Sequence, residues 1–458
     1  MTGWEQQIKT LIEPCLAASK VTDVVRIGPG VIAETGHVAS QLTDTRRALI
    51  MADDAGFAAA GAPVVASLEA AGFEIETLVL PADPLPQASV EEAEPFRAAL
   101  AADPTLFPVS VGSGVINDLV KYAAFETDRR YLTVATAASM DGYTSAGAPL
   151  ARGGFKVTIP VRAPVAMIAD LGVITAAPAE MNGWGFGDLA GKIPAGGDWI
   201  LADLVGAEPI DDRAWSLVQD TLVGWLSNPA GIPARDQDTV ARLFVGLTAV
   251  GFAMEFHGSS RPASGADHQI AHLWEMEGHT HGGRKVSHGA AVAIGAVAAL
   301  ALYDWLLTQD LSGLDAAAVA ARAPDLATRE AALLSAIPDP NISAKALGEL
   351  RAKHVDHATL EARLARISAG WDATRTRLAD NLVRQSEMVD MLRAAGSPAF
   401  AADIGVGQDH LMSTIRAAAF IRRRYTILDF LHETGLTEDA LAAVAPKLID
   451  ARRMEKSA

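Results

Sequence analysis

Histidine is concentrated in one short segment of this 458-residue chain. Six of the eleven histidines lie between His257 and His288, where an even distribution would place fewer than one. Neutral imidazole binds divalent metals and transfers protons near neutral pH. His268 and His272 are four residues apart in HQIAH, so a helix would present both on one face. The cluster predicts a metal or proton-transfer site, and a solvated pair on a helix surface is the alternative for HxxxH alone.

A carboxylate that would complete such a site is Asp188, which follows a glycine-rich turn in AEMNGWGFGDLAGK. We expect a helix to begin there, so a helix cap is the other interpretation. One carboxylate and two imidazoles leave a coordination position open, as catalytic metal sites require. We predict Asp188, His268 and His288 as the metal ligands, with His288 at the start of the next apolar helix. His272 would lie beside the metal and hold substrate or move a proton.

A second pattern, VSVGSGVINDLVK, predicts a strand, a small-residue turn and a helix. Small residues at such a turn let the backbone approach a phosphate, and the helix N-terminus offers it unpaired N–H groups. The residues concerned are Gly112, Ser113, Gly114, Asn117 and Asp118. A tight turn that needs glycine is the alternative interpretation.

Two further strand ends carry polar residues. Asp53 ends RALIMAD, and an acid after an early strand of a nucleotide-binding sheet commonly accepts hydrogen bonds from a ribose. A helix cap is again the alternative. The loop TAASMDGYTSAG, Thr136–Gly147, places small residues around Asp141, which suits close contact with a flat ring or a sugar. Two strands of one sheet that both end in candidate ligand-binding residues favour a dinucleotide over a mononucleotide as the ligand.

These residues need a sheet to position them, and the first half of the chain provides the pattern for one. Apolar strands alternate with helices, which is typical of a parallel sheet covered on both faces. The expected strands span residues 21–28, 47–54, 73–80, 106–114, 130–136 and 163–170. Helical periodicity then continues to the C-terminus. We predict an α/β, Rossmann-like dinucleotide-binding domain over residues 1–177 and an all-α domain that binds metal and substrate over residues 178–458.

Composition excludes several classes of function. The net charge of −17 argues against binding to nucleic acid or to anionic membranes. A single cysteine, Cys15, excludes an internal disulfide and fits a reducing, cytoplasmic compartment. No secretory signal is evident at the N-terminus. The longest apolar run, Gly289–Tyr303, is shorter than the ~20 residues of a membrane span, so we expect a buried core helix there and no membrane insertion.

Several of these motifs together resemble the sn-glycerol-1-phosphate dehydrogenases, and most closely their bacterial members. These belong with the iron-type alcohol dehydrogenases, glycerol dehydrogenases and dehydroquinate synthases. The resemblance rests on GSGVINDLVK, TAASMDGYTS, GFGDLAGK, GSSRPASGADHQIAHLWEM and SHG, in that order. It covers the chain from about Val21 to IRRRYTILDF. Ser113 stands where the superfamily usually has glycine, Asp267 where we expect glutamate, and the HGE of many relatives is HGA here.

The resemblance implies a dehydroquinate synthase-like fold and roles for individual residues. Asp188, His268 and His288 would bind one divalent metal, with zinc expected first and nickel or iron as alternatives. Asp141, Asp188 and His272 would contact substrate as catalytic residues. NAD(H), NADP(H) or both would serve as cofactor. Cofactor contacts are implied for Gly114, Val115, Ile116, Asn117, Asp118, Thr136, Ala137, Ala138, Ser139 and Ser145.

The implied reaction is the reversible reduction of dihydroxyacetone phosphate to sn-glycerol 1-phosphate, which depends on metal and NAD(P)H. Substrate phosphate needs cationic or N–H donors, and Arg261 is our first candidate, ahead of Ser260, Lys192 and the Arg284–Lys285 pair. Another metal-dependent polyol or sugar-phosphate dehydrogenase, a dehydroquinate-synthase-like cyclase and a non-catalytic protein are the alternatives. The relatives also lead us to expect a homo-oligomer, a dimer or larger.

Overall fold

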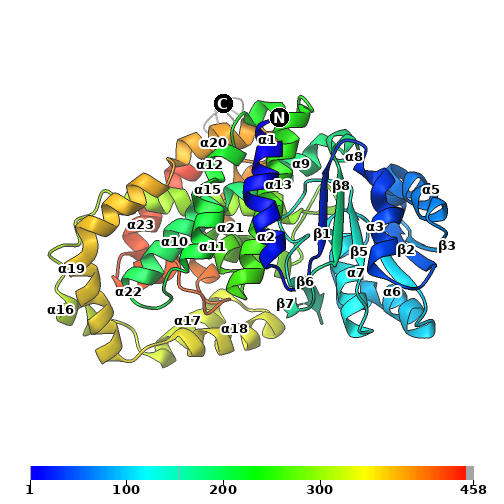
Figure 1. Ribbon diagram of the computed structural model, residues 1–458. Helices are drawn as coiled ribbons and strands as arrows, with labels where there is room; N and C mark the ends of the chain where they lie inside the picture. Colours follow the sequence, from blue (N-terminus) through cyan, green and yellow to red (C-terminus); the bar gives the residue numbers. More distant parts are fainter. Residues whose placement is uncertain (1, 154, 450–458) are drawn as a thin grey trace. The chain divides into compact units, whose positions relative to one another are not determined.

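The computed structural model describes residues 2–153 and 155–449 (Figure 1). It divides into two compact units. The first contains residues 1–189 and 220–259, and the second contains residues 190–219 and 260–458.

The first unit is built on a six-stranded sheet in the order β1-β8-β5-β4-β2-β3. All neighbouring strands in this sheet are parallel. In this order, the strands are β1 (Val24–Gly28), β8 (Ala166–Asp170), β5 (Leu132–Ala135), β4 (Phe107–Gly112), β2 (Arg47–Asp53) and β3 (Glu74–Leu80).

Helices cover both faces of the sheet, and β2 shows how its side chains divide between them. Ala48, Ile50 and Ala52 pack in one core with helices α3 (Thr35–Leu42) and α5 (Ala62–Ala70). Leu49 and Met51 pack in a second core with α6 (Val90–Ala102) and α7 (Gly114–Glu126). Alternate residues of a strand point to opposite faces, so a strand buried on both sides is apolar throughout.

The other elements of the first unit lie around this sheet. Two strands, β6 (Gly147–Arg152) and β7 (Phe155–Pro160), form a separate antiparallel pair. The remaining α-helices are α1 (Gly3–Gln7), α2 (Glu13–Ala18), α4 (Asp54–Gly56), α8 (Leu171–Ala176), α9 (Ala179–Ala190), α12 (Leu222–Trp225) and α13 (Gln237–His257). Two five-residue segments are π-helical, Ile8–Ile12 and Phe57–Gly61.

Over its described residues, 190–219 and 260–449, the second unit has one two-stranded pair, β9 (Thr280–His281) with β10 (Arg284–Lys285), and is otherwise built from helices and their connections. Its long apolar helix is α15 (His288–Leu306), which packs against α14 (Ala266–Met276). Its other α-helices are α10 (Lys192–Leu204), α11 (Asp212–Gln219), α16 (Ala316–Ala320), α17 (Leu326–Ala336), α18 (Pro340–Lys353), α19 (His357–Asn381), α20 (Gln385–Ala394), α21 (Gln408–Ala418), α22 (Ile427–Glu433) and α23 (Thr437–Val444).

The predicted fold class is confirmed: a parallel sheet with helices is followed by a mostly helical part. The first compact unit is larger than the predicted domain of residues 1–177, because it also includes most of α9, the short helix α12 and the long helix α13. Trp4 explains part of this, since its indole N–H donates to Asp238 of α13 over 2.9 Å. The division of the chain by function at residue 177 stays a prediction. The β6–β7 and β9–β10 pairs were not predicted.

Two helices within residues 2–153 and 155–449 are long and apolar enough to cross a membrane by length and composition, namely α13 and α15. Most of each helix is buried inside the protein. The expectation of a buried core helix over Gly289–Tyr303 is confirmed, because all of these residues are buried within α15.

Candidate functional site

Three neighbouring strands of the first unit end at the predicted cofactor residues. Asp53 ends β2, Gly112 ends β4, and Thr136 follows β5 directly. The Thr136 N–H donates to the Gly112 carbonyl over 3.1 Å, which joins two of these ends. The helices that follow β2 and β4 lie on opposite faces of the sheet, as the two cores show. Such a switch point at the carboxyl ends of parallel strands is where open α/β sheets bind ligands.

The turn from β4 into α7 presents main chain to this edge. Ser113 is the N-cap of α7, with no hydrogen bond from its side chain to the helix, and both Ser113 and Val115 are partly exposed. Asn117 and Asp118, in contrast, are buried. The Asn117 amide oxygen accepts from the Tyr131 hydroxyl over 3.2 Å, and Asp118 lies 3.4 Å from the ammonium of Lys121. The first turn of α7 therefore offers backbone amides to a ligand, while these two side chains support the protein.

Asp53 is a helix N-cap, as the alternative interpretation held. Its Oδ1 accepts the N–H of Gly56 over 2.8 Å at the start of α4. Burial raises the pKa of Asp53, and the Gly56 N–H acts in the opposite direction. A cap at a strand end also lies where a ribose would bind, so the two roles are compatible in one carboxylate.

The loop over residues 136–147 is held by hydrogen bonds along its length. The Tyr143 hydroxyl donates to the Ala137 carbonyl over 2.9 Å, and the Thr144 hydroxyl donates to Thr248 of α13 over 2.9 Å. The Ala138 N–H donates to the side-chain oxygen of Asn182 over 3.0 Å. This loop is therefore a rigid surface beside the strand ends.

Lys121 secures the far end of the same loop from α7. Its fully buried ammonium donates to the carbonyls of Gly142 and Gly147 over 2.6 and 3.1 Å, and lies 3.4 Å from the Ser145 hydroxyl. Burial lowers the pKa of Lys121, and the nearby carboxylate of Asp118 opposes this. One cation thus joins α7 to the loop around Asp141.

Asp188 lies against the same loop. It is fully buried, and its Oδ2 accepts the N–H of Asp141 over 3.1 Å. The expectation that a helix begins after Asp188 is wrong, because Asp188 is in the last turn of α9. Gly185, one turn earlier, allows the close approach: a Cβ there would come within 1.8 Å of the Ala138 carbonyl oxygen. Gly185 of NGWGFGD therefore serves close packing inside a helix.

The three histidines of the predicted site come together in the second unit. His268 and His272 lie on one face of α14, and His288 begins α15. The ring centroids are 5.8 Å apart for His268 and His272, 5.2 Å for His268 and His288, and 5.6 Å for His272 and His288. Gly295 lets the two helices pack this closely, since a Cβ there would come within 2.2 Å of the Asp267 carbonyl oxygen.

A buried carboxylate fixes the start of α14. Asp198 of α10 is fully buried and accepts the Ala266 N–H over 2.6 Å at the first turn of α14. It also accepts from the Tyr303 hydroxyl and the Ile427 N–H, each over 2.7 Å. Burial raises the pKa of Asp198 to about 7, against the effect of these donors. Asp198 therefore caps α14 from a neighbouring helix, because Gly265 at its N-cap has no side chain.

Each predicted metal-binding imidazole contacts a carboxylate through Nδ1. The Nδ1 of His268 lies 2.5 Å from Asp267, whose other oxygen accepts the Gly265 N–H over 2.9 Å. The Nδ1 of His288 lies 2.7 Å from Glu275. A carboxylate at Nδ1 fixes the ring orientation and assigns Nε2 as the atom that would face a metal.

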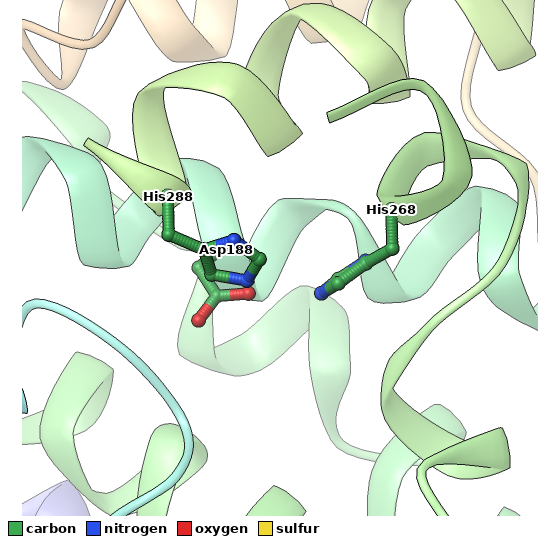
Figure 2. Close-up of side chains that lie close together, drawn as sticks. All are labelled: Asp188, His268 and His288. Carbon is green, nitrogen blue, oxygen red and sulfur yellow. The ribbon is translucent and has the colours of Figure 1, made fainter. Parts of the chain in front are cut away.

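Asp188, His268 and His288 each offer a ligand atom, and these atoms all lie within 4.8 Å of one another. Figure 2 shows the His268 ring pointing toward the Asp188 carboxylate and the His288 ring. Asp188 directly precedes Leu189, where the first segment of the first unit ends. The last residue of α9, Ala190, belongs to the second unit. His272, Glu275 and His288 form a second group of the same kind. The two groups share His288.

Arg261, our first candidate for the substrate phosphate, is fully buried among protein partners. Its guanidinium donates to the carbonyls of Tyr425 and Asp198 over 2.9 and 2.7 Å and lies 3.3 Å from Glu208. These contacts assign Arg261 to the protein framework, and we do not propose it as a phosphate ligand. Lys192, a later candidate, is also fully buried.

Sequence reasoning overlooked several residues that support the site. Lys121 and Asn182 hold the loop over residues 136–147, and Glu275 orients His288. Glu275 had a signal, because it follows His272 by three residues and therefore lies on the same helix face. Lys121 lies within the quoted motif but reads as a surface lysine. Asn182 gave no signal that could be used.

Comparison with known proteins decides the family. Residues 26–178 match the family model described as "Iron-containing alcohol dehydrogenase". The chain is 31% identical over 375 residues to the "Glycerol-1-phosphate dehydrogenase [NAD(P)+]" of Bacillus subtilis (strain 168), with 82% of each chain covered. The chain belongs to the glycerol-1-phosphate dehydrogenase family. A protein of the same name from Methanothrix thermoacetophila is 34% identical over 285 residues, which cover 62% of this chain and 78% of that one.

Several solved structures share the fold. A probable glycerol dehydrogenase from Sinorhizobium meliloti 1021 matches with a TM-score of 0.59 at 18% identity, covering 93% of this chain and 97% of that one. The NADH-dependent butanol dehydrogenase A of Thermotoga maritima matches with a TM-score of 0.56 at 14% identity, covering 92% and 96%. At these identities the likeness shows the fold alone. The predicted family is confirmed, and the chain is an oxidoreductase.

Proposed function

We propose that this protein catalyses the reversible reduction of dihydroxyacetone phosphate to sn-glycerol 1-phosphate with NADH, NADPH or both. The observation that supports it most is the grouping of Asp188, His268 and His288 within 4.8 Å, with Asp188 hydrogen-bonded to the loop around Asp141. The relatives from Bacillus subtilis and Methanothrix thermoacetophila are named for this activity with NAD(P)+.

We assign the metal to Asp188, His268 and His288, and the donor set fits a divalent ion. A buried carboxylate and two imidazoles whose Nδ1 atoms face carboxylates match the ligands of catalytic zinc, and they also suit nickel and iron. A metal bound there supplies Lewis-acid chemistry, polarising a carbonyl and lowering the pKa of an alcohol.

The protein's own groups have separate tasks in this proposal. Asp141 and Asp188 position the substrate hydroxyls at the edge of the loop over residues 136–147. His272 lies beside the two metal-binding imidazoles and moves a proton to or from the substrate oxygen. The rigid loop holds the reacting carbon and the cofactor in a fixed relative geometry. A bimolecular step then becomes effectively unimolecular.

The cofactor is assigned to the strand ends of the first unit. The backbone amides from Gly112 to Asp118 would bind the pyrophosphate at the start of α7. Asp53 would accept from the ribose. Thr136, Ala137, Ala138, Ser139 and Ser145 would contact the nicotinamide half. A carboxylate at the end of β2 repels the 2′-phosphate of NADP, so we propose a preference for NAD(H).

Purified protein mixed with dihydroxyacetone phosphate and NADH, then NADPH, tests this function by the loss of nicotinamide absorbance. We expect loss that a chelator stops and added zinc, nickel or iron restores, and a chiral assay should identify the 1-phosphate. Turnover only of unphosphorylated polyols, or of no carbonyl substrate with metal bound, would reject the proposed substrate.

We further propose a cytoplasmic homo-oligomer, a dimer or larger. The single cysteine, Cys15, which is buried, supports a reducing compartment. Light scattering on the purified protein would measure the assembly, and a monomer at micromolar concentration would reject this part of the proposal.

A further inference from the structure

Three arginines of the second unit lie close enough to influence one another's charge. Arg261 and Arg422 both lower the pKa of Arg424, while burial is the largest cause that brings it to about 9. Arg261 precedes α14, and the other two come from the segment IRRRYT before α22. Their bonding differs in one respect that points to a ligand.

Two of the three guanidinium groups are occupied by the protein. Arg261 donates to two backbone carbonyls and lies beside Glu208. Arg424 donates to the carbonyl and hydroxyl of Ser264 over 2.8 and 2.7 Å, and to the Ser260 hydroxyl over 2.9 Å. These two arginines therefore build the loop that leads into α14.

Arg422 is different. Its side chain is partly buried, and it makes no hydrogen bond or close ion pair with any residue in the part of the chain that the structure describes. Burial lowers the pKa of Arg422, and the charges of Glu349 and Glu275 oppose this. A partly buried cation without a hydrogen-bonded protein partner can accept an anion, because charged groups that leave bulk water in proteins are normally paired.

Arg422 also lies near the histidine cluster. Glu275, whose charge acts on Arg422, contacts the Nδ1 of His288 over 2.7 Å. The segment is joined to α14 next to His268, because the Gln269 side chain donates to the Arg424 carbonyl over 3.2 Å. The unpaired cation is therefore within electrostatic range of the imidazoles assigned to metal and substrate.

We propose that Arg422 binds the phosphate group of the substrate. A guanidinium offers paired N–H donors in a geometry that matches two phosphate oxygens. The positive charges of Arg261 and Arg424 add to the attraction without using their own donors. This inference rests on the proposed function, and it makes Arg422 the residue that distinguishes a phosphorylated substrate from dihydroxyacetone.

The neighbouring residue supplies a matched control. Arg423 has the same charge and adjoins Arg422, but its side chain is exposed, and its backbone N–H donates to Glu349 over 2.8 Å. Removing the Arg423 side chain changes the net charge equally and leaves the proposed phosphate contact intact.

The experiment compares Arg422→Ala, Arg422→Lys and Arg423→Ala with the natural protein on two substrates. We expect Arg422→Ala to raise KM for dihydroxyacetone phosphate by about 10- to 100-fold, the range for losing charged hydrogen bonds. KM for dihydroxyacetone should change by less than about threefold, Arg422→Lys should recover part of the loss, and Arg423→Ala should behave as the natural protein. Equal losses on both substrates, or no loss, would overturn the proposal.

A second measurement does not depend on turnover. Inorganic phosphate should raise the thermal unfolding midpoint of the natural protein and of Arg423→Ala, because ligands that bind the folded state stabilise it, but not that of Arg422→Ala. An equal shift in all three, or none in any, would reject Arg422 as a phosphate ligand. If phosphate stabilises only the proteins that retain Arg422 but dihydroxyacetone phosphate is not reduced, the phosphate site stands and the proposed reaction fails.

Discussion

Replacing Lys121 with methionine should strongly destabilise the first unit. The change keeps an unbranched side chain that is one atom shorter, and it removes an ammonium that is fully buried. Two carbonyls, those of Gly142 and Gly147, would lose this donor, at about 1–3 kcal/mol for each buried group left without a partner. The buried carboxylate of Asp118 would lose its ion-pair partner, and breaking a buried ion pair costs about 3–5 kcal/mol. These effects overlap, and the desolvation of Lys121 is recovered, so we expect a net loss of about 3–5 kcal/mol.

Urea unfolding followed by tryptophan fluorescence and circular dichroism would measure this loss. Lys9→Met, at an exposed lysine, is the control and should unfold within about 0.5 kcal/mol of the natural protein. Adding Asp118→Asn to Lys121→Met removes the charge that Lys121 balanced and should recover about 1–3 kcal/mol. Binding of NADH should weaken in Lys121→Met because the loop loses its anchor. A stability within about 0.5 kcal/mol of the natural protein, or a double variant less stable than Lys121→Met, would refute this reasoning.

The remaining predictions concern the loop, the buried acid and the metal-binding imidazole. Gly185→Ala should destabilise the protein by about 1–3 kcal/mol and weaken NADH binding, because the new methyl group would overlap the Ala138 carbonyl. The control is Gly224→Ala, where a Cβ meets nothing within 4 Å. Equal urea midpoints for the two variants would contradict the prediction. The pKa of Asp198 is raised to about 7, so its contribution to stability is complete below its unfolded pKa and is lost as pH rises toward 7. The free energy of unfolding of the natural protein should therefore fall, relative to that of Asp198→Asn, as urea titrations move from pH 5 to pH 8; a constant difference would contradict the assignment. Glu275→Ala should lower metal affinity by about 10- to 100-fold in chelator competition, because His288 loses the carboxylate that orients it, and unchanged affinity would remove that role.

The central sheet was predictable because its strands are apolar throughout. Residues such as Ile50 and Met51 face opposite cores, so the strand carries no polar side and is bounded by turn residues. The β6–β7 pair was missed although Lys156–Ile159 alternates polar and apolar residues, the pattern of a half-buried strand. Pro149 and the glycines around it concealed the partner strand. No sequence pattern indicates that α13 packs with the first unit, because only tertiary contacts decide that.

The sequence predicted which candidate ligand side chains lie close together, and it predicted fewer of the residues that support them. The spacing of His268 and His272 predicted one helix face for both, and in the structure both rings lie close to that of His288. The position of Asp188 was misjudged because glycine lowers helix propensity, and only the structure shows that Gly185 serves close packing.

The arginines show a different limit of sequence reasoning. Arg261 stands in the most specific motif of the chain, but its donors are used by Tyr425 and Asp198. Arg422 stands in a run of three arginines, which suggests a solvated surface. Only the hydrogen bonds distinguish a framework arginine from one that is left to bind a ligand.

The most direct test of the central claim combines metal content and turnover in the natural protein and in Asp188→Asn. Both proteins would be stripped with a chelator, reloaded with zinc, nickel or iron, and assayed with NADH and dihydroxyacetone phosphate. We predict one metal ion per chain and NADH oxidation only in the reloaded natural protein, because the neutral amide of the variant cannot replace the carboxylate even though its circular dichroism spectrum is that of a folded protein. Equal NADH oxidation by the stripped protein, or by Asp188→Asn, would contradict the account.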